Sequence, residues 1–242
     1  MTALILDATL LGAHPSPPDP NDWQLPLDTA APLPPKFKAT LIGPVLNQGN
    51  TGRCVAFSGT GIRQQQERSD GDWPKGWPPL DPEWLYEHAE AIDGIPAPPG
   101  PQRGTTVRAA LQVLAKQGQP LTGKPATAPK FRIAAYHAVP FTADAIKRAL
   151  VQYGPVWIAI RFNSAWFHPV NGVMPAPNGS WDGGHAIYVW GYDDTVAGGS
   201  AVIRNSWAKS WGLNGNAYFP WRYLLPALHD AWSTTDQKGS RP

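Results

Sequence analysis

The sequence is poor in cysteine, because its 242 residues include a single one, Cys54. One cysteine cannot form a disulfide within the chain, so the composition gives no indication of an oxidising compartment. We therefore expect synthesis in the reducing cytoplasm, while release by cell lysis or by a dedicated secretion system stays open. A lone buried cysteine usually fills space like a small apolar side chain, and the alternative is that it acts as a reagent.

Charged residues and long apolar runs are also scarce. Charged residues make up 16% of the chain, the formal net charge is +2, and Lys and Arg form no long run, which argues against nucleic acid as a partner. No apolar stretch approaches the roughly 18 residues that span a bilayer, so we expect no membrane partner. The N-terminus has no Lys or Arg ahead of its short apolar start, and we therefore expect no secretory signal peptide.

Apolar and aromatic residues, by contrast, are abundant. Hydrophobic residues make up 42% of the chain and 12 residues are tryptophan, which is enough for one large domain or two small lobes. Many of the 28 prolines fall in residues 13–35, where they favour an extended arm without a helix. The arm is either a disordered tail or a strap laid across the body. Trp23 and Leu25 favour the strap, because two apolar anchors are unfavourable in water.

The rest of the chain has helix patterns in its first half and strand patterns in its second. Asp81 before Pro82 is typical of a helix start, and Gly71 and Gly118 are typical of helix ends. The patterns predict helices over 54–69, 81–93, 105–118 and 142–154, and strands over 155–162, 184–194, 200–207 and 216–221. This order predicts an α+β protein of two lobes. We divide the chain into an N-terminal proline-rich arm (1–32), a folded domain (33–228) and a C-terminal tail (229–242).

Cys54 lies at the predicted start of the first helix, in "NQGNTGRCVAF". A free cysteine is mostly protonated at neutral pH, and a helix N-terminus or a nearby imidazolium lowers its pKa. Gly49 and Gly52 permit a tight turn that leaves the sulfur accessible. The second device requires a histidine near the cysteine.

His185 is the strongest of six histidines for that purpose. It follows two glycines and opens a predicted strand, so it can project into a groove between the lobes. We expect ordinary structural roles for the other five, which are His14, His88, His137, His168 and His229.

Three further residues suit cysteine chemistry. Asn205 ends a predicted strand and can hold the imidazole by its other nitrogen. Trp207 can shield that hydrogen bond from water. The side chain of Gln48 and the backbone N–H of Cys54 can converge on a developing oxyanion.

Taken together and in order, the segments "QGNTGRCVAF", "GGHAIYVWGYDD" and "IRNSWAKSWGLNGNAYFPWRYL" resemble the papain-like (C1) cysteine peptidases, and "RGTTVRAALQVLAKQG" and "GPVWIAI" fit between them. The resemblance covers about residues 33–228. It implies a papain-like α+β fold with a helical left lobe, an antiparallel β-barrel right lobe, and an active-site cleft between them.

The resemblance also implies roles. Cys54 resembles the nucleophile and His185 the base, which forms a thiolate–imidazolium pair and later protonates the leaving amine. Asn205 resembles the residue that orients the base, Gln48 the oxyanion donor, and Trp207 the shield. The implied reaction is acylation of the cysteine by a polypeptide substrate followed by hydrolysis, and it requires no metal or cofactor.

The substrate cleft is also inferred from the resemblance. Gly104 and Thr105 are expected to contact the substrate backbone. The main side-chain pocket is expected to use Val107 and Ala186, with Ile158 as a further candidate, and to suit an apolar residue two positions before the scissile bond. Gly184 is also expected to contact the substrate. The loops 94–104 and 168–184 are expected to narrow the cleft.

The sequence departs from the family in several places. Val55 stands where the family usually has tryptophan, Ala208 where it has glycine, and the usual disulfides are missing. These departures favour the bacterial or virus-encoded branch. The N-terminal extension is too short and proline-rich for a helical inhibitory pro-segment, so we expect no conventional zymogen, and the arm is a candidate to cover the cleft instead.

Two other functions stay open at this point. The chain could be a binding or structural module that keeps the peptidase fold, for example in a phage particle or another assembly, although the intact Gln48, Cys54, His185 and Asn205 argue against lost catalysis. The same four residues could also transfer the acyl group to an amine instead of water.

Overall fold

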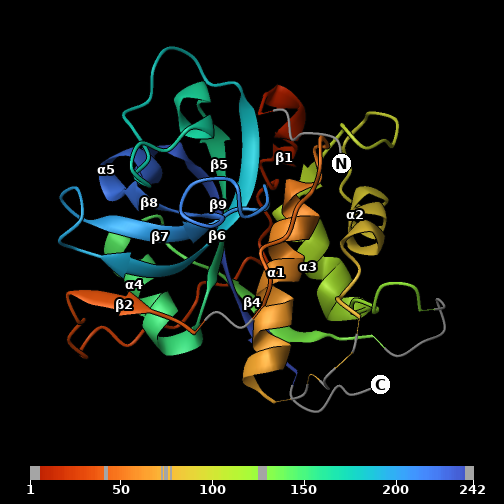
Figure 1. The fold of residues 1–242 in the computed structure, drawn as a ribbon. Coiled ribbons are helices and arrows are strands. Elements are labelled where there is room, and N and C mark those ends of the chain that lie inside the picture. The colour runs from red at the N-terminus through yellow and green to blue at the C-terminus, as the bar shows by residue number, and fades with distance from the viewer. Residues whose placement is uncertain are drawn as a thin grey trace.

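The fold comes from a computed structural model, in which residues 6–40, 43–71, 73, 76, 78–124 and 130–237 are described. Helices gather on one side and a mainly antiparallel sheet on the other, with α1 between them (Figure 1). The helices are α1 (Cys54–Ser69), α2 (Pro82–Glu90), α3 (Val107–Lys116), α4 (Ala143–Tyr153) and α5 (Trp221–Leu224), with short 3-10 turns η1 (Ala8–Leu10), η2 (Ser164–Phe167) and η3 (Leu225–Ala227). The strands are β1 (Ala13–His14), β2 (Lys36–Lys38), β3 (Thr105–Thr106), β4 (Ile133–Ala138), β5 (Val156–Phe162), β6 (Gly183–Asp193), β7 (Ser200–Arg204), β8 (Asn216–Pro220) and β9 (Leu228–Asp236).

Helices α2, α3 and α4 begin at side chains that satisfy some of their free N–H groups. The carboxylate of Asp81 accepts from Glu83 N and Trp84 N ahead of α2, and the hydroxyls of Thr106 and Thr142 cap α3 and α4. Such caps favour a helix start by about 1 kcal/mol each. The first helix has the predicted bounds, whereas α2 ends before the predicted residue 93.

The sheet is open, so the predicted closed barrel is wrong. Its strand order is β4-β9-β5-β6-β7-β8, with β2 added beside β6. The outer strands satisfy their free backbone groups with loops and not with each other. Ala138 N in β4 donates to Trp23 O of the arm at 2.9 Å, and Tyr218 N in β8 donates to Gly172 O at 2.8 Å. The predicted α+β papain-like architecture is otherwise present.

The predicted C-terminal tail is also wrong over most of its length. Residues Leu228–Asp236 form β9, which lies between β4 and β5 inside the sheet. The strand was not predicted because its sequence is polar. Asp230 and Thr234 are nevertheless buried and bonded to distant segments: Asp230 Oδ2 accepts from Ser16 N at 3.0 Å and Thr234 O accepts from Gln66 Nε2 at 2.9 Å. Residues 238–242 lie outside the described part of the chain.

Deleting residues 228–242 is therefore expected to abolish folding. The deletion removes an interior strand and leaves two unpaired edges with exposed N–H and C=O groups. Far-ultraviolet circular dichroism and a thermal melt check this result, with a chain that lacks only residues 238–242 as the matched control. A cooperative melt of the longer deletion near the control's Tm would contradict the assignment of β9 to the core of the sheet.

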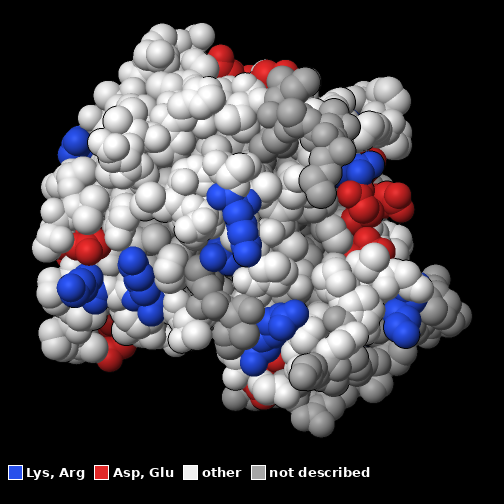
Figure 2. All heavy atoms as spheres, in the orientation of Figure 1, with Lys and Arg blue, Asp and Glu red and all other residues white. Residues whose placement is uncertain are grey.

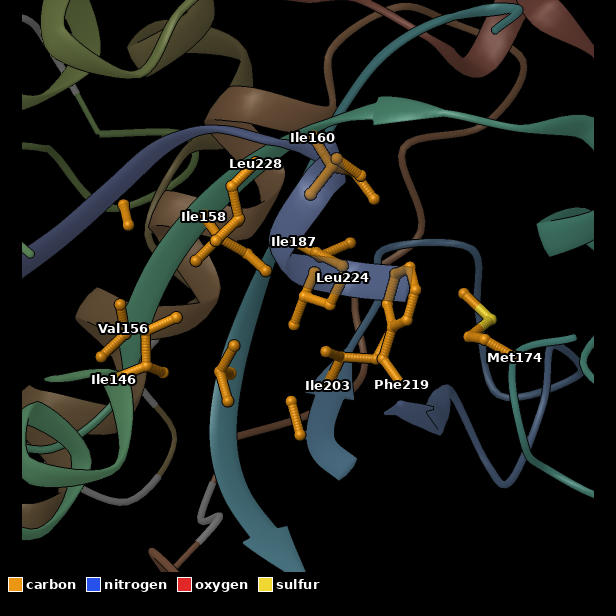
Figure 3. Close-up of a cluster of buried hydrophobic side chains, with 14 of the residues drawn as sticks. Ile146, Val156, Ile158, Ile160, Met174, Ile187, Ile203, Phe219, Leu224 and Leu228 are labelled. Atoms are coloured by element: carbon orange, nitrogen blue, oxygen red, sulfur yellow. The ribbon is translucent and has the colours of Figure 1, made fainter. Parts of the chain in front are cut away.

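The sheet separates two apolar cores. One lies between the sheet and α4 and includes Ile158, Ile160 and Ile187 (Figure 3). The other lies between the sheet and helices α1 to α3, and it takes Trp157 and Ala159 from the same strand. Because side chains alternate along a strand, Ile158 points away from the helices. The sequence-based placement of Ile158 in the substrate pocket is therefore wrong.

Close packing of α1 on the sheet fixes the position of Cys54. A side chain at Gly59 would begin 2.2 Å from the indole of Trp157, so only glycine lets the helix approach this far. The indole N–H of Trp157 donates to Ser58 Oγ at 2.8 Å, and Ser58 Oγ donates to Cys54 O at 2.7 Å. The start of α1 is thereby tied to the sheet.

Charge is thinly spread over the molecule. On the face drawn in Figure 2, Lys and Arg side chains form separate patches among wide uncharged areas. Within the described residues, the helices are too short or too polar to cross a bilayer.

Candidate active site

Cys54 is the first residue of α1 and is fully buried, with 0% of its surface exposed. No side chain caps this helix end, so its free N–H groups and dipole favour negative charge near the sulfur. The tight turn predicted ahead of the cysteine is present, since Gly49 has a φ of 63°.

Gln48 is held by the segment that carries Asn205. Its backbone N donates to Ser206 O at 2.9 Å, and the hydroxyl of Ser206 donates to Oε1 of Gln48 at 2.7 Å. Oε1 is thereby occupied, and the amide Nε2 donates both to Thr51 O at 2.5 Å and to Leu10 O of the N-terminal arm. The structure thus places the expected oxyanion donor in a fixed orientation.

His185 lies near the start of β6 and is also fully buried. Its Nε2 lies 2.8 Å from Oδ1 of Asn205, and that oxygen also accepts from Ser206 N at 2.8 Å. The indole of Trp207, itself buried, lies over the imidazole with ring centroids 4.5 Å apart. The following residue, Ala186, directs its backbone N–H at the Cys54 sulfur, so the predicted residues meet at one place.

Burial keeps the cysteine and histidine neutral in this arrangement. It raises the pKa of the Cys54 thiol to about 11, although hydrogen bonds from the N–H groups of Ala186, Gly12 and Val55 oppose the rise. It lowers the pKa of His185 to about 4, against the hydrogen bond to Asn205. A neutral thiol and a neutral imidazole therefore coexist from about pH 4 to about pH 11 while the site is covered.

The N-terminal arm causes this burial, because it runs through the cleft. Strand β1 pairs in parallel with β3, with Ala13 opposite Thr105, and Thr105 N donates to Gly12 O at 2.9 Å. The amide of Gln48 donates to Leu10 O at 3.0 Å. The expected oxyanion donor is therefore occupied by a carbonyl of the protein's own arm, and β1 lies between the sheet and the helices (Figure 1).

Glycines form both walls where the arm passes. A Cβ at Gly12 would lie 1.8 Å from Gly52 O, a Cβ at Gly104 would lie 2.1 Å from Gly12 O, and one at Gly184 would lie 1.8 Å from Ala13 O. The cleft here is as narrow as two backbones allow.

The predicted side-chain pocket is filled by the arm. Ala13 packs in the same buried cluster as Val107 and Ala186. The structure therefore places the five expected substrate contacts around residues 12–13 of the arm; they are Gly104, Thr105, Val107, Gly184 and Ala186.

Beyond the cleft, the arm is bound to the body as a strap. Leu25 is buried as predicted, but Trp23 is 70% exposed and anchors only through its backbone. Tyr153 Oη donates to Pro26 O at 2.6 Å and Tyr192 Oη donates to Pro34 O at 2.7 Å. Residues 1–5 of the predicted arm lie outside the described residues.

Sequence reasoning missed three residues of this site. Ser206 positions Gln48, and Leu10 and Gly12 occupy the cleft. Ser206 follows Asn205 directly, but nothing in the sequence indicates that it positions Gln48. Nothing in a short segment such as "LLGAHP" indicates which groove it will occupy.

The other histidines have ordinary partners where the structure assigns one. His14 lies 2.7 Å from Arg103 O, His88 stacks on Trp84, and His229 lies 3.2 Å from Asp230. Within the described ranges, no three His, Cys, Asp or Glu side chains cluster as metal ligands.

Known proteins match this chain in sequence. Residues 115–222 match the papain family of cysteine proteases. Mouse cathepsin K is 28% identical over 197 residues, which cover 74% of this chain and 56% of that protein. Human cathepsin O is 31% identical over 90 residues, which cover 36% of this chain and 28% of that protein. The chain therefore spans about half or less of the length of these relatives.

Known structures match the fold over almost its whole length. Xylellain, a cysteine protease from Xylella fastidiosa, has a TM-score of 0.83 at 22% identity, and the match covers 98% of this chain and all of that one. Procathepsin B S9 from Trypanosoma congolense has a TM-score of 0.75 at 16% identity, covering 96% and 88%. The family match contains His185 and Asn205 but begins after Cys54 and Gln48, so the placement of these two rests on geometry.

Proposed function

We propose that the chain is a papain-family (C1) cysteine endopeptidase with Cys54, His185 and Asn205 as its catalytic triad, a proposal that the family match over residues 115–222 and the likeness in fold to xylellain support. One observation carries the proposal. A buried His185–Asn205 hydrogen bond is covered by Trp207, and the residue after His185, Ala186, directs its backbone N–H at Cys54, the only cysteine of the chain and the first residue of α1.

Each side chain then has a definite task. His185 takes the thiol proton, and the Cys54 sulfur attacks the peptide carbonyl carbon. The carbonyl oxygen gains negative charge and accepts hydrogen bonds from Gln48 Nε2 and Cys54 N. His185 returns the proton to the leaving amine, and water then hydrolyses the thioester with the imidazole as base. Asn205 holds the ring in place throughout.

The covered structure is a resting form of this enzyme. The arm must leave before a substrate can reach the sulfur, and its departure admits water and removes the desolvation that keeps both groups neutral. A thiolate–imidazolium pair becomes favourable only in the uncovered form. The inhibitory segment is thus an extended strand and not the helical pro-segment that the sequence argued against.

The pH profile of alkylation tests the proposal. Iodoacetamide labels Cys54 in the intact chain only when the arm opens transiently, and this requirement slows the reaction at every pH. The dependence of the rate on pH is then set by the ionisation of Cys54 and His185 in the opened form. We expect labelling at pH 5 to be nearly as fast as at pH 8, measured by mass spectrometry, because an ion pair is a thiolate at both.

His185→Ala is the control for this profile. It is expected to remove labelling at pH 5 and to leave a rise near the ordinary thiol pKa of about 8.5. A wild-type profile that itself rises only near pH 8.5 would exclude the ion pair and with it the peptidase mechanism.

Substrate preference and branch complete the proposal. Val107 and Ala186 suit a small or apolar side chain where Ala13 now lies. Val55, Ala208 and the structural likeness to xylellain support the bacterial or virus-encoded branch. Digestion of a peptide library with and without an added amine separates hydrolysis from acyl transfer, and no turnover at all would favour a structural module such as a phage-particle component.

A further inference from the structure

We propose that Arg108 is a specificity residue, which binds an acidic side chain of the peptide on the acyl side of the scissile bond. The proposal rests on the proposed function only in taking the cleft as the substrate site. In the covered form the arm supplies the acidic group itself, through Asp22.

Arg108 is buried, yet its partners belong to the arm. Its side chain is 9% exposed. Nε donates to Asp22 Oδ1 at 2.9 Å, Nη2 donates to Asp22 Oδ2, and Nη1 donates to Pro17 O. Among the described residues, every recorded hydrogen bond and ion pair of this guanidinium goes to Pro17 or Asp22 of the arm, and its recorded contact with the body is the ring of Trp232.

The surroundings of Arg108 form a built site. Its guanidinium lies over the ring of Trp232, 5.5 Å from the centroid, and an open cavity of about 320 Å³ lies beside it. Asp230, also on this cavity and 3% exposed, accepts the backbone N–H of Ser16 at 3.0 Å. A bound peptide can therefore donate a backbone N–H to Asp230 and place an acidic side chain against Arg108.

The path of the arm places this site relative to the reaction centre. Leu6 lies beside Trp211, Gly12 N–H meets the Cys54 sulfur, and Pro17 reaches Arg108. His185, which protonates the leaving amine, lies under Trp207, in the core that also holds Trp211. The end of the cleft near Trp211 and Leu6 therefore takes the leaving-amine side of the substrate. Arg108 is at the opposite end, on the acyl side. Gly12 and Pro17 are five residues apart along the arm, so the acidic residue is expected up to about five positions before the scissile bond.

When the arm leaves, Arg108 loses Asp22 and favours binding of another carboxylate. Once the arm has left, the guanidinium has lost its carboxylate and meets the water that enters the cleft, and a bidentate carboxylate is the partner that best fits it. An amide isostere supplies no charge, and a lysine adds repulsion. An acidic peptide therefore gains about ten- to hundredfold in affinity over its amide counterpart.

Binding to the full chain tests the proposal without catalysis. The protein carries Cys54→Ala to prevent turnover, Gly12→Val to displace the arm from the cleft, and Asp22→Asn to remove the competing carboxylate. Fluorescein-labelled peptides carry one Asp at each of the candidate positions, each paired with an Asn peptide. We expect an Asp peptide to bind at least tenfold more tightly by fluorescence anisotropy, and restoring Asp22 to reduce this ratio.

Two variants separate a specific contact from general attraction. Arg108→Met is expected to bring the Asp/Asn ratio to within twofold, while Arg161→Met, which removes an exposed arginine near the cleft, leaves the ratio unchanged. Equal binding of both peptides, no binding of either, or equal losses in the two variants would overturn the proposal. A charge preference in a protein without peptidase activity would refute the proposed function alone.

Discussion

Replacing Gly12 by valine is expected to open the active site and to raise the rate of Cys54 alkylation and of peptide hydrolysis by about ten- to hundredfold. The first atom of any side chain at this position would lie 1.8 Å from the carbonyl oxygen of Gly52. Both are backbone-defined positions in a narrow cleft, so the overlap cannot be relieved by a rotamer change. The arm must withdraw, and the covered form loses its advantage.

The measurement compares the variant with wild type in two assays, iodoacetamide labelling and cleavage of a quenched peptide library. Ala30→Val is the matched control, because residue 30 is an exposed part of the arm outside the cleft. It is expected to change neither rate. Unchanged rates in Gly12→Val, with Tm close to that of wild type, would show that residues 10–14 do not limit access to Cys54.

Replacing Cys54 by alanine is expected to lower peptide hydrolysis by at least about 10⁴-fold, because removing the nucleophile removes the acyl-enzyme route. The fold is expected to persist, since the change deletes one sulfur atom from a buried site and leaves the close contact of Gly59 with Trp157 intact. The activity is best measured in the Gly12→Val background, where the cleft is open and the wild-type cysteine gives the largest signal.

Near-ultraviolet circular dichroism gives the structural control for this variant, because 12 tryptophans report on the packing of both cores. A spectrum and Tm close to those of the parent, together with lost turnover, assign the loss to chemistry. Residual turnover by the purified variant that also resists an epoxysuccinyl inhibitor would identify another nucleophile and refute the role of Cys54.

Local signals explain why the helices and the site residues were predictable. Caps such as Asp81 and end signals such as Gly118 act within a few residues, and the structure follows them. The placement of Cys54, His185 and Asn205 in one site follows from the family motifs, whose segments the sheet and α1 bring together. None of these inferences required knowledge of distant contacts.

The misjudged elements depend on distant contacts. Strand β9 has a polar sequence, and its burial is favourable because Gln66 and Ser16, far away in the sequence, satisfy some of its polar groups. The inward or outward direction of Ile158 depends on strand register, where a shift of one residue reverses the face. The sheet stays open because the arm and a loop satisfy its edge strands, which no local pattern reveals.

The contact between Ser16 and Asp230 also has a consequence for the order of events during biosynthesis. The arm is the first described segment to leave the ribosome, whereas Asp230 lies in β9, which follows every other described element along the chain. The hydrogen bond from Ser16 to Asp230 can therefore form only after β9 has been synthesised. The full set of contacts that holds the arm over the cleft therefore requires the completed sheet.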